Sequence, residues 1–187
     1  MNGVRWRIGG GENPTSAAMM RRVTRLFVAV WPPDDVAETL RGLRRKDERG
    51  VRFVPPENWH ITLRFLGEAD PDEVGAALDS GSYERSVARL GPGVDVLKRH
   101  SVIVPVHGID GLASEVGRVT QALGTEPERT TFVGHLTLAR MKRHARPPAV
   151  TGAHVRDSFE VAEVALVQST LASTGAVYTT LATWPTA

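Results

Sequence analysis

The sequence predicts an α+β protein, and two observations lead to this prediction. Short runs rich in β-branched and aromatic residues alternate with segments of helical spacing, but without the strict strand–helix–strand order of a parallel α/β sheet. The chain has 187 residues, of which 41% are hydrophobic and 24% are charged, as in ordinary globular proteins. This length favours one domain, or two small lobes that share a core.

Strands are expected where β-rich runs end at turn-forming residues. In chain order these runs are Thr24–Trp31, Trp59–Leu66, Ser86–Leu90, Ser101–His107, His135–Met141, Val161–Gln168 and Ala176–Thr183, with a short extended piece at Val51–Val54.

Helices are expected where apolar residues recur at spacings of three and four, over Asp34–Arg45 and Asp110–Leu123. A third helix is expected to begin after Asp70. An aspartate, then Pro71 at the first helical position, then Glu73 three residues after the aspartate form a helix-start pattern.

The composition excludes several kinds of site. The chain has no cysteines, so disulfides, thiolate catalysis and cysteine-bound zinc are excluded. The absence of cysteine fits a reducing compartment, and we expect a cytoplasmic protein. No apolar run of about 18 residues occurs, so we expect no membrane-spanning helix. The net charge of +2 is too small to indicate a nucleic-acid-binding surface by itself.

Residues 1–22 are Gly-rich and show neither helical nor strand periodicity. They also lack the apolar core of a secretory signal. We therefore expect a flexible N-terminal extension over residues 1–22, followed by a single domain over residues 23–187.

Two four-residue segments repeat one pattern. His60-Ile61-Thr62-Leu63 and His135-Leu136-Thr137-Leu138 each consist of a histidine, an aliphatic residue, a threonine and a leucine, and both lie in runs that read as strands. Side chains at positions i and i+2 share one face of a strand. Each segment therefore presents one imidazole and one hydroxyl on its polar face.

Two such faces turned toward each other suit the chemistry of an anion. One histidine can be neutral and the other protonated near neutral pH, so the pair can divide the work of base and acid. Two threonine hydroxyls can donate hydrogen bonds to charged oxygens. A phosphodiester fits this description. One copy of the pattern alone is typical of an ordinary half-exposed strand, but two copies favour the catalytic interpretation.

A metal site is the main competing interpretation of the histidines. Neither segment has a second histidine two or four residues away, and neither contains a carboxylate. Because zinc takes at least three protein ligands even in catalytic sites, we expect no metal and no other cofactor.

The same segments resemble a known family. HITLRFLGE (His60–Glu68) and HLTLAR (His135–Arg140) are similar to the two signature motifs of the 2H phosphoesterase superfamily. The most similar branch is that of the RNA 2′,3′-cyclic phosphodiesterases, also called 2′-5′ RNA ligases. RLFVAVWPP (Arg25–Pro33), VRFVPPENWH (Val51–His60) and VQSTLASTGAVYTTLATW (Val167–Trp184) resemble further parts of this family.

The resemblance implies a fold and an activity. The fold would be a bilobal, pseudo-twofold α+β domain, in which two mostly antiparallel sheets flank a central cleft and the helices lie outside. The reaction would open a 2′,3′-cyclic phosphate to a 2′-phosphomonoester. By position, His60 and His135 would be the catalytic pair, and Thr62 and Thr137 would hold the phosphate. We expect His60 to protonate the departing 3′ oxygen and His135 to activate water, with the reverse assignment left open.

Two arginines are further candidates for binding the phosphate. Strict alternation puts Arg64 on the face of His60, where it contacts the phosphate or lies at the rim. The family often has an arginine at the position of Arg140, but alternation puts this residue on the face opposite His135, so a bulge or an indirect role is needed. Phe27 and Trp31 either stack on a base or pack in the protein.

The resemblance also implies the partners. RNA ends or small cyclic nucleotides would be the substrates, no membrane is involved, and we expect a monomer without an obligate protein partner. A role in RNA processing is a family-level expectation. Two alternatives stay open: the same site run backwards as a 2′-5′ RNA ligase, and a non-catalytic module that binds RNA ends or nucleotides.

Overall fold

The computed structural model describes residues 23–46, 48–126, 131–173 and 175–187. The extension expected at residues 1–22 lies outside this range. The helices are α1 (Asp34–Arg41), α2 (Pro71–Asp79), α3 (Asp110–Val119) and a short 3-10 helix, η1 (Pro56–Asn58). The strands are β1 (Thr24–Val30), β2 (Val51–Phe53), β3 (Ile61–Ala69), β4 (Val87–Leu90), β5 (Asp95–Leu97), β6 (Ser101–His107), β7 (His135–Met141), β8 (Asp157–Glu160), β9 (Glu163–Ala172) and β10 (Gly175–Pro185).

The α+β class is confirmed, and the element boundaries differ from expectation at a few points. Helix α1 ends at Arg41 and not at Arg45, because Gly42 follows as the C-cap. Helix α3 ends at Val119, four residues earlier than its apolar spacing predicts. Strands β5 and β8 were not expected, since each is short and is held by pairing with a neighbouring strand.

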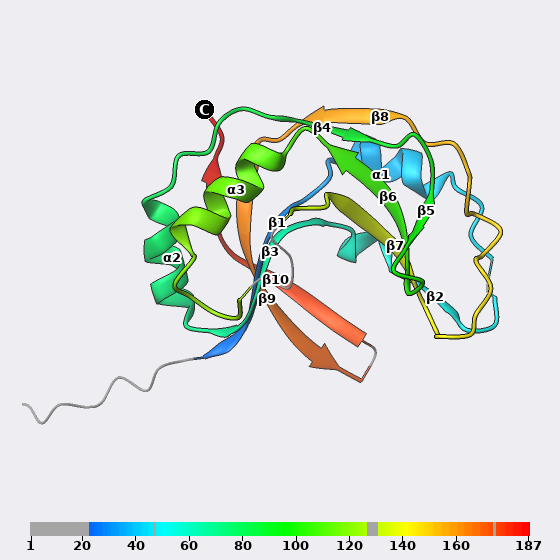
Figure 1. Cartoon of the computed structure of the whole chain (residues 1–187), viewed down its shortest axis with the longest axis horizontal. Coiled ribbons are helices and arrows are strands. Elements are labelled where there is room, and N and C mark those ends of the chain that lie inside the picture. The colour runs from blue at the N-terminus through cyan, green and yellow to red at the C-terminus, as the bar shows by residue number, and fades with distance from the viewer. Residues whose placement is uncertain (1–22, 47, 127–130, 174) are drawn as a thin grey trace, which may run out of the picture.

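The sheet has two halves that meet in the middle of the molecule. Within the described residues the strand order is β10-β9-β1-β3-β7-β6-β4-β8, with β2 paired to β7 and β5 to β6, and every pairing is antiparallel. The resemblance predicts two sheets, and here they are joined edge to edge by the pairing of β3 with β7. Figure 1 shows α2 and α3 beside the first half, while β5, β6, β7 and β2 form the second half.

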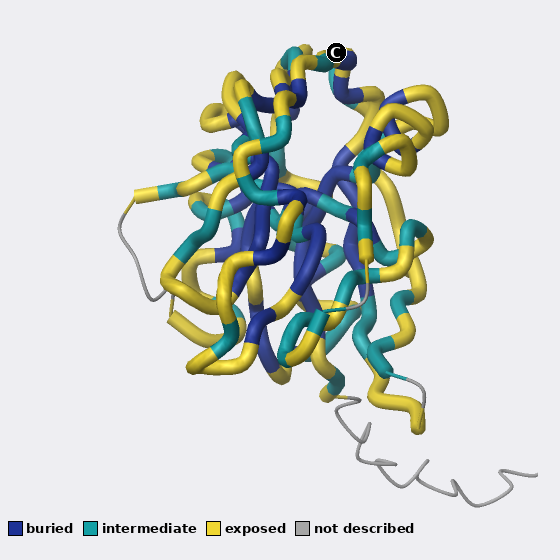
Figure 2. Tube along the Cα trace, turned by 90° about the vertical axis from the view of Figure 1, so that its right-hand side faces the viewer, coloured by how far each residue is buried: buried dark blue, intermediate teal, exposed yellow. Residues whose placement is uncertain are grey.

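The two halves share one hydrophobic core. Its buried cluster includes Leu26 and Val28 of β1, Val102 and Val104 of β6, and Leu112 of α3. Figure 2 shows that the buried residues gather in the central strands, with exposed residues in the surrounding loops and helices. Among the described helices, none has both the length and the apolar character needed to cross a lipid bilayer.

Candidate active site

The two repeated segments are brought together by a single backbone pair. Ile61 of β3 pairs with Leu136 of β7, and both side chains are fully buried in the core. Because side chains alternate along a strand, the residues on either side of this pair point to the opposite face of the sheet. We call this face, which carries both repeated histidines, the histidine face.

The antiparallel register arranges the four polar side chains as a near-symmetric set. When the register of the Ile61–Leu136 pair is extended by one residue in each direction, His60 lies across from Thr137 and Thr62 lies across from His135. Diagonal neighbours in an antiparallel pair lie about 7–8 Å apart. By this register the two imidazoles lie about that far apart, a separation that suits one phosphate group, with a threonine beside each.

The imidazole of His60 is enclosed by aromatic rings. Its ring centroid lies 4.8 Å from that of Phe27, 5.1 Å from that of Tyr178 and 5.7 Å from that of Trp31. Phe27 is only 4% exposed, so the packing interpretation of this residue is confirmed. Trp31 is partly buried against the same cluster.

The protonation of His60 follows from its surroundings. Nδ1 lies 2.7 Å from the carbonyl oxygen of Asn58, which can only accept a hydrogen bond, so Nδ1 carries the hydrogen and Nε2 is the nitrogen left for a ligand. Desolvation by burial lowers the pKa of His60 below its usual value. The bond to Asn58 raises the pKa, and the positive charges of Arg140 and His135 lower it further. His60 is therefore neutral at pH 7 in the free protein.

His135 is held in the same way as His60. Its Nδ1 lies 2.7 Å from the carbonyl oxygen of Val133, again two residues earlier in the chain. The threonines complete the set: Thr62 pairs with Ala29 of β1, Thr137 pairs with Ile103 of β6, and both are partly buried. Both repeated segments therefore place an imidazole and a hydroxyl on the histidine face.

A β-bulge follows the threonine in both segments. The extra residue is Leu63 in β3 and Leu138 in β7, each left without a partner where the pairing register shifts. A bulge reverses the alternation of side chains beyond it. The fifth residue of each segment therefore turns to the core, and the sixth turns to the histidine face.

The expectation that Arg64 lies on the face of His60 is wrong, because Arg64 is the fifth residue. Its side chain is 6% exposed and points to the side where α3 packs on β3. The guanidinium donates hydrogen bonds to Gly117 O (3.0 Å), Thr120 Oγ1 (2.8 Å) and Leu123 O (3.0 Å). Arg64 therefore fastens the end of α3 to the sheet and does not face the phosphate site.

Arg140 lies on the histidine face, because it is the sixth residue and follows the bulge. Its Nη1 donates a 2.7 Å hydrogen bond to Ser101 Oγ. Its charge acts on His60, whose pKa it lowers. Arg140 therefore lies close enough to contribute positive charge to the site, as the bulge alternative required.

The sequence interpretation missed several residues near the repeated histidines, among them Tyr178, whose ring contacts His60. Phe65, the sixth residue of the first segment, is 44% exposed, and the Arg25 guanidinium lies 4.9 Å from its ring centroid. Arg52 of β2 pairs with Arg140 and so shares its face. The offset of 75 residues that relates the two histidines also relates Phe65 to Arg140, and applying it beyond the histidines and threonines would have found Phe65.

The described part of the chain contains no cluster of three or more histidine, aspartate or glutamate side chains that could hold a metal ion. The independence of the reaction from metal stays a prediction. Positive charge at the site comes instead from Arg140 and, when it is protonated, from His135.

Comparisons with known proteins agree with this site. A family model described as LigT-like phosphoesterase matches residues 30–88. An RNA 2′,3′-cyclic phosphodiesterase from Aeropyrum pernix is 35% identical over 148 residues, which cover 70% of this chain and 84% of the relative. The chain belongs to the LigT-like phosphoesterases of the 2H superfamily. This phosphoesterase is therefore an enzyme, and the alternative of a non-catalytic module is excluded.

Further relatives cover nearly all of the described phosphoesterase. An RNA 2′,3′-cyclic phosphodiesterase from Aquifex aeolicus is 30% identical over 178 residues, covering 84% of this chain and 95% of the relative. A crystal structure of a Thermus thermophilus protein matches with a TM-score of 0.73 at 28% identity, covering 86% and 97% of the two chains. The Escherichia coli LigT structure complexed with 3′-AMP has a TM-score of 0.73 at 24% identity over 88% and 99%. The predicted fold class is confirmed.

Proposed function

We propose that the phosphoesterase hydrolyses 2′,3′-cyclic phosphates, at RNA ends or on nucleosides, to 2′-phosphomonoesters. The observation that carries this proposal is the register of β3 with β7, which brings the strand segments of the two histidines and two threonines side by side. The names of the relatives, which are RNA 2′,3′-cyclic phosphodiesterases, support this choice of substrate.

The two histidines divide the proton transfers of the reaction. A base removes a proton from water as its oxygen attacks phosphorus, and an acid protonates the 3′ oxygen as its bond to phosphorus breaks. The products are the 2′-phosphomonoester and a free 3′ hydroxyl. Because a cyclic phosphate is strained, the acid–base pair and the cationic site can open it without a metal.

The environment of His60 favours the base role for this residue, the reverse of the assignment expected from the sequence. Burial among aromatic rings lowers its pKa, so the ring is neutral at pH 7. With Nδ1 donating to Asn58, the lone pair of Nε2 is available to accept a proton from water. His135, on the other side of the phosphate space, then acts as the acid.

The remaining polar groups bind the charged oxygens. The hydroxyls of Thr62 and Thr137 donate to the non-bridging oxygens, and Arg140 supplies a positive charge that balances the charge gained in the transition state. Such fixed donors need no reorganisation as the reaction proceeds, which is how preorganised sites lower an activation barrier.

The test uses a 2′,3′-cyclic mononucleotide, with the product analysed by ³¹P NMR. We expect formation of the 2′-phosphomonoester, and equal rates with and without EDTA. A 3′-phosphomonoester product, or loss of activity with EDTA that added metal restores, would contradict the proposal. An RNA carrying a 5′ hydroxyl, added in the same assay, reports the reverse 2′-5′ ligation as a joined product.

A further inference from the structure

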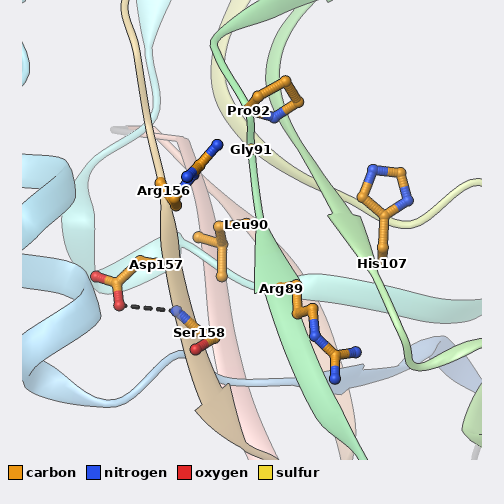
Figure 3. A pocket seen from close by; sticks show the side chains of 8 residues that line it. All are labelled: Arg89, Leu90, Gly91, Pro92, His107, Arg156, Asp157 and Ser158. Atoms are coloured by element: carbon orange, nitrogen blue, oxygen red, sulfur yellow. Dashed lines mark hydrogen bonds between the residues drawn. The ribbon is translucent and has the colours of Figure 1, made fainter.

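A cavity of about 550 Å³ lies at the far edge of the second half of the sheet. Among its lining residues are Arg89 of β4, His107 of β6, and Arg156 and Ser158 at β8. Its volume is within the range of small-molecule and nucleotide sites. We call it the basic cavity. Figure 3 shows Arg89 and His107 on neighbouring strands, with Arg156 reaching toward Gly91.

Three residues that line the basic cavity, Arg89, His107 and Ser158, lie on the histidine face. Pro105 of β6 pairs with His135, and His107 lies two residues further along the same strand, so the two side chains share a face. Arg89 of β4 pairs with His107 of β6 and with Ser158 of β8. The side chains of Arg89 and Ser158 therefore lie on the same face as His107. Two residues of strand span about 7 Å. The cavity is therefore about one nucleotide away from His135.

The cavity carries positive charge that no described side chain neutralises. Among the described residues, no hydrogen bond or ion pair is made by the side chains of Arg89, Arg156 or His107, and all three are exposed. The single carboxylate of the lining, Asp157, accepts a hydrogen bond from the backbone of Ser158 and points away from Arg89 and His107 in Figure 3. The free groups are therefore donors, as an anion requires.

Another cavity of the described structure has the opposite character. It has a volume of about 370 Å³ and lies between α2 and β10. Its lining includes Asp72 and Asp79 and no arginine, lysine or histidine. A phosphate would be repelled there, so of these two cavities the basic cavity is the one whose charge suits an anion.

We propose that the basic cavity binds the phosphodiester that precedes the terminal nucleotide of an RNA substrate. The inference rests on the proposed function, because it starts from a cyclic phosphate held between His60 and His135. From that phosphate the RNA strand then runs past Pro105 to the basic cavity. There Arg89 and Arg156 bind the charged oxygens of the next phosphate of the RNA, and the Ser158 hydroxyl donates a hydrogen bond to the same phosphate. The preferred substrate is consequently an RNA end and not a free cyclic mononucleotide.

The experiment compares two substrates: a 2′,3′-cyclic mononucleotide, and a trinucleotide that ends in the same 2′,3′-cyclic nucleotide. We expect a higher kcat/KM for the trinucleotide. Arg89→Gln and Arg156→Gln lower kcat/KM for the trinucleotide about 10-fold each, as for the loss of one charge-assisted hydrogen bond, and leave the mononucleotide unchanged. Arg89→Lys keeps the charge and retains most of the preference.

Salt dependence gives an independent readout. Each phosphate contact to a single strand contributes about 0.7 to the slope of log affinity against log salt concentration. We expect the salt slope of Arg89→Gln to be smaller than that of the wild type by about 0.7 with the trinucleotide, and to be unchanged with the mononucleotide. Arg41→Gln is the matched control, since Arg41 lies on α1 and pairs with Glu38. Thermal unfolding of each variant checks that the fold is retained.

Two results would overturn the inference while leaving the proposed function intact. One is equal kcat/KM of the wild type on both substrates, and the other is an equal loss on both substrates in Arg89→Gln. If the wild type turns over neither substrate, the proposed function itself fails and the inference fails with it.

Discussion

At the scale of single residues, the aromatic enclosure of His60 is the feature that sets the chemistry of the site. Burial lowers the pKa of this histidine, so the neutral base persists to a lower pH than for a histidine in water. The acid limb of kcat/KM against pH, which reports the base in the free enzyme, therefore lies below pH 6.5.

Tyr178→Ala tests this cause directly. The Tyr178 ring covers one side of His60 at 5.1 Å, and its removal admits water. We expect the pKa of His60 to rise toward the ordinary value of a histidine in water, so that the acid limb moves to higher pH. NMR titration of the His60 ring and the pH–rate profile measure the same shift. An acid limb that stays in place while the NMR titration moves would show that His60 is not the base.

Arg64 and Arg140 should respond to substitution in opposite ways. Arg64→Met removes three hydrogen bonds to the end of α3, so we expect it to lower the free energy of unfolding by about 3 kcal/mol and to leave kcat nearly unchanged in the folded protein.

Arg140→Met removes an exposed cation beside His60. We expect it to lower kcat/KM at least ~10-fold with little loss of stability. Denaturant unfolding and steady-state kinetics of both variants measure these effects. A loss of activity without a loss of stability in Arg64→Met, with the opposite result in Arg140→Met, would contradict the placement of the two arginines on opposite faces.

At the scale of elements, the two β-bulges explain where the sequence interpretation succeeded and where it failed. Alternation correctly put each histidine and its threonine on one face, because both precede the bulge. Beyond Leu63 and Leu138 alternation reverses, so Arg64 was placed on the wrong face. A bulge depends on the register of the neighbouring strand, which a local pattern does not contain. The strands β5 and β8 were missed for the same reason, since their pairing holds them.

Local signals were sufficient where an element depends on its own residues. The start of α2 is an example: the Asp70 side chain accepts a 2.9 Å hydrogen bond from the backbone of Asp72, as the helix-start pattern predicts. We expect Asp70→Ala to lower the free energy of unfolding by about 1 kcal/mol. Asp72→Ala is the matched control, because it removes a first-turn carboxylate but no cap, and should cost about 0.5 kcal/mol. Equal losses in urea unfolding would mean that the cap contributes nothing.

At the scale of the whole molecule, the site exists because the two halves of the sheet meet at one place. The repeated segments are separated by 75 residues and come from different halves, yet one pair, Ile61 with Leu136, fixes their relative register. The doubled pattern in the sequence indicated a shared site, but only the family resemblance implied that the two strands face one space. The basic cavity could not be foreseen, because its residues come from three strands whose order the sequence does not reveal.

The most direct test of the central claim is kcat/KM of His60→Ala, His135→Ala and the double variant on a 2′,3′-cyclic mononucleotide, with His154→Ala, an exposed histidine, as the control. We expect each single variant to lose about 10²–10⁴-fold. The double variant should lose little more than the worse single one, since the pair acts as a unit. Wild-type rates in either single variant would contradict the account.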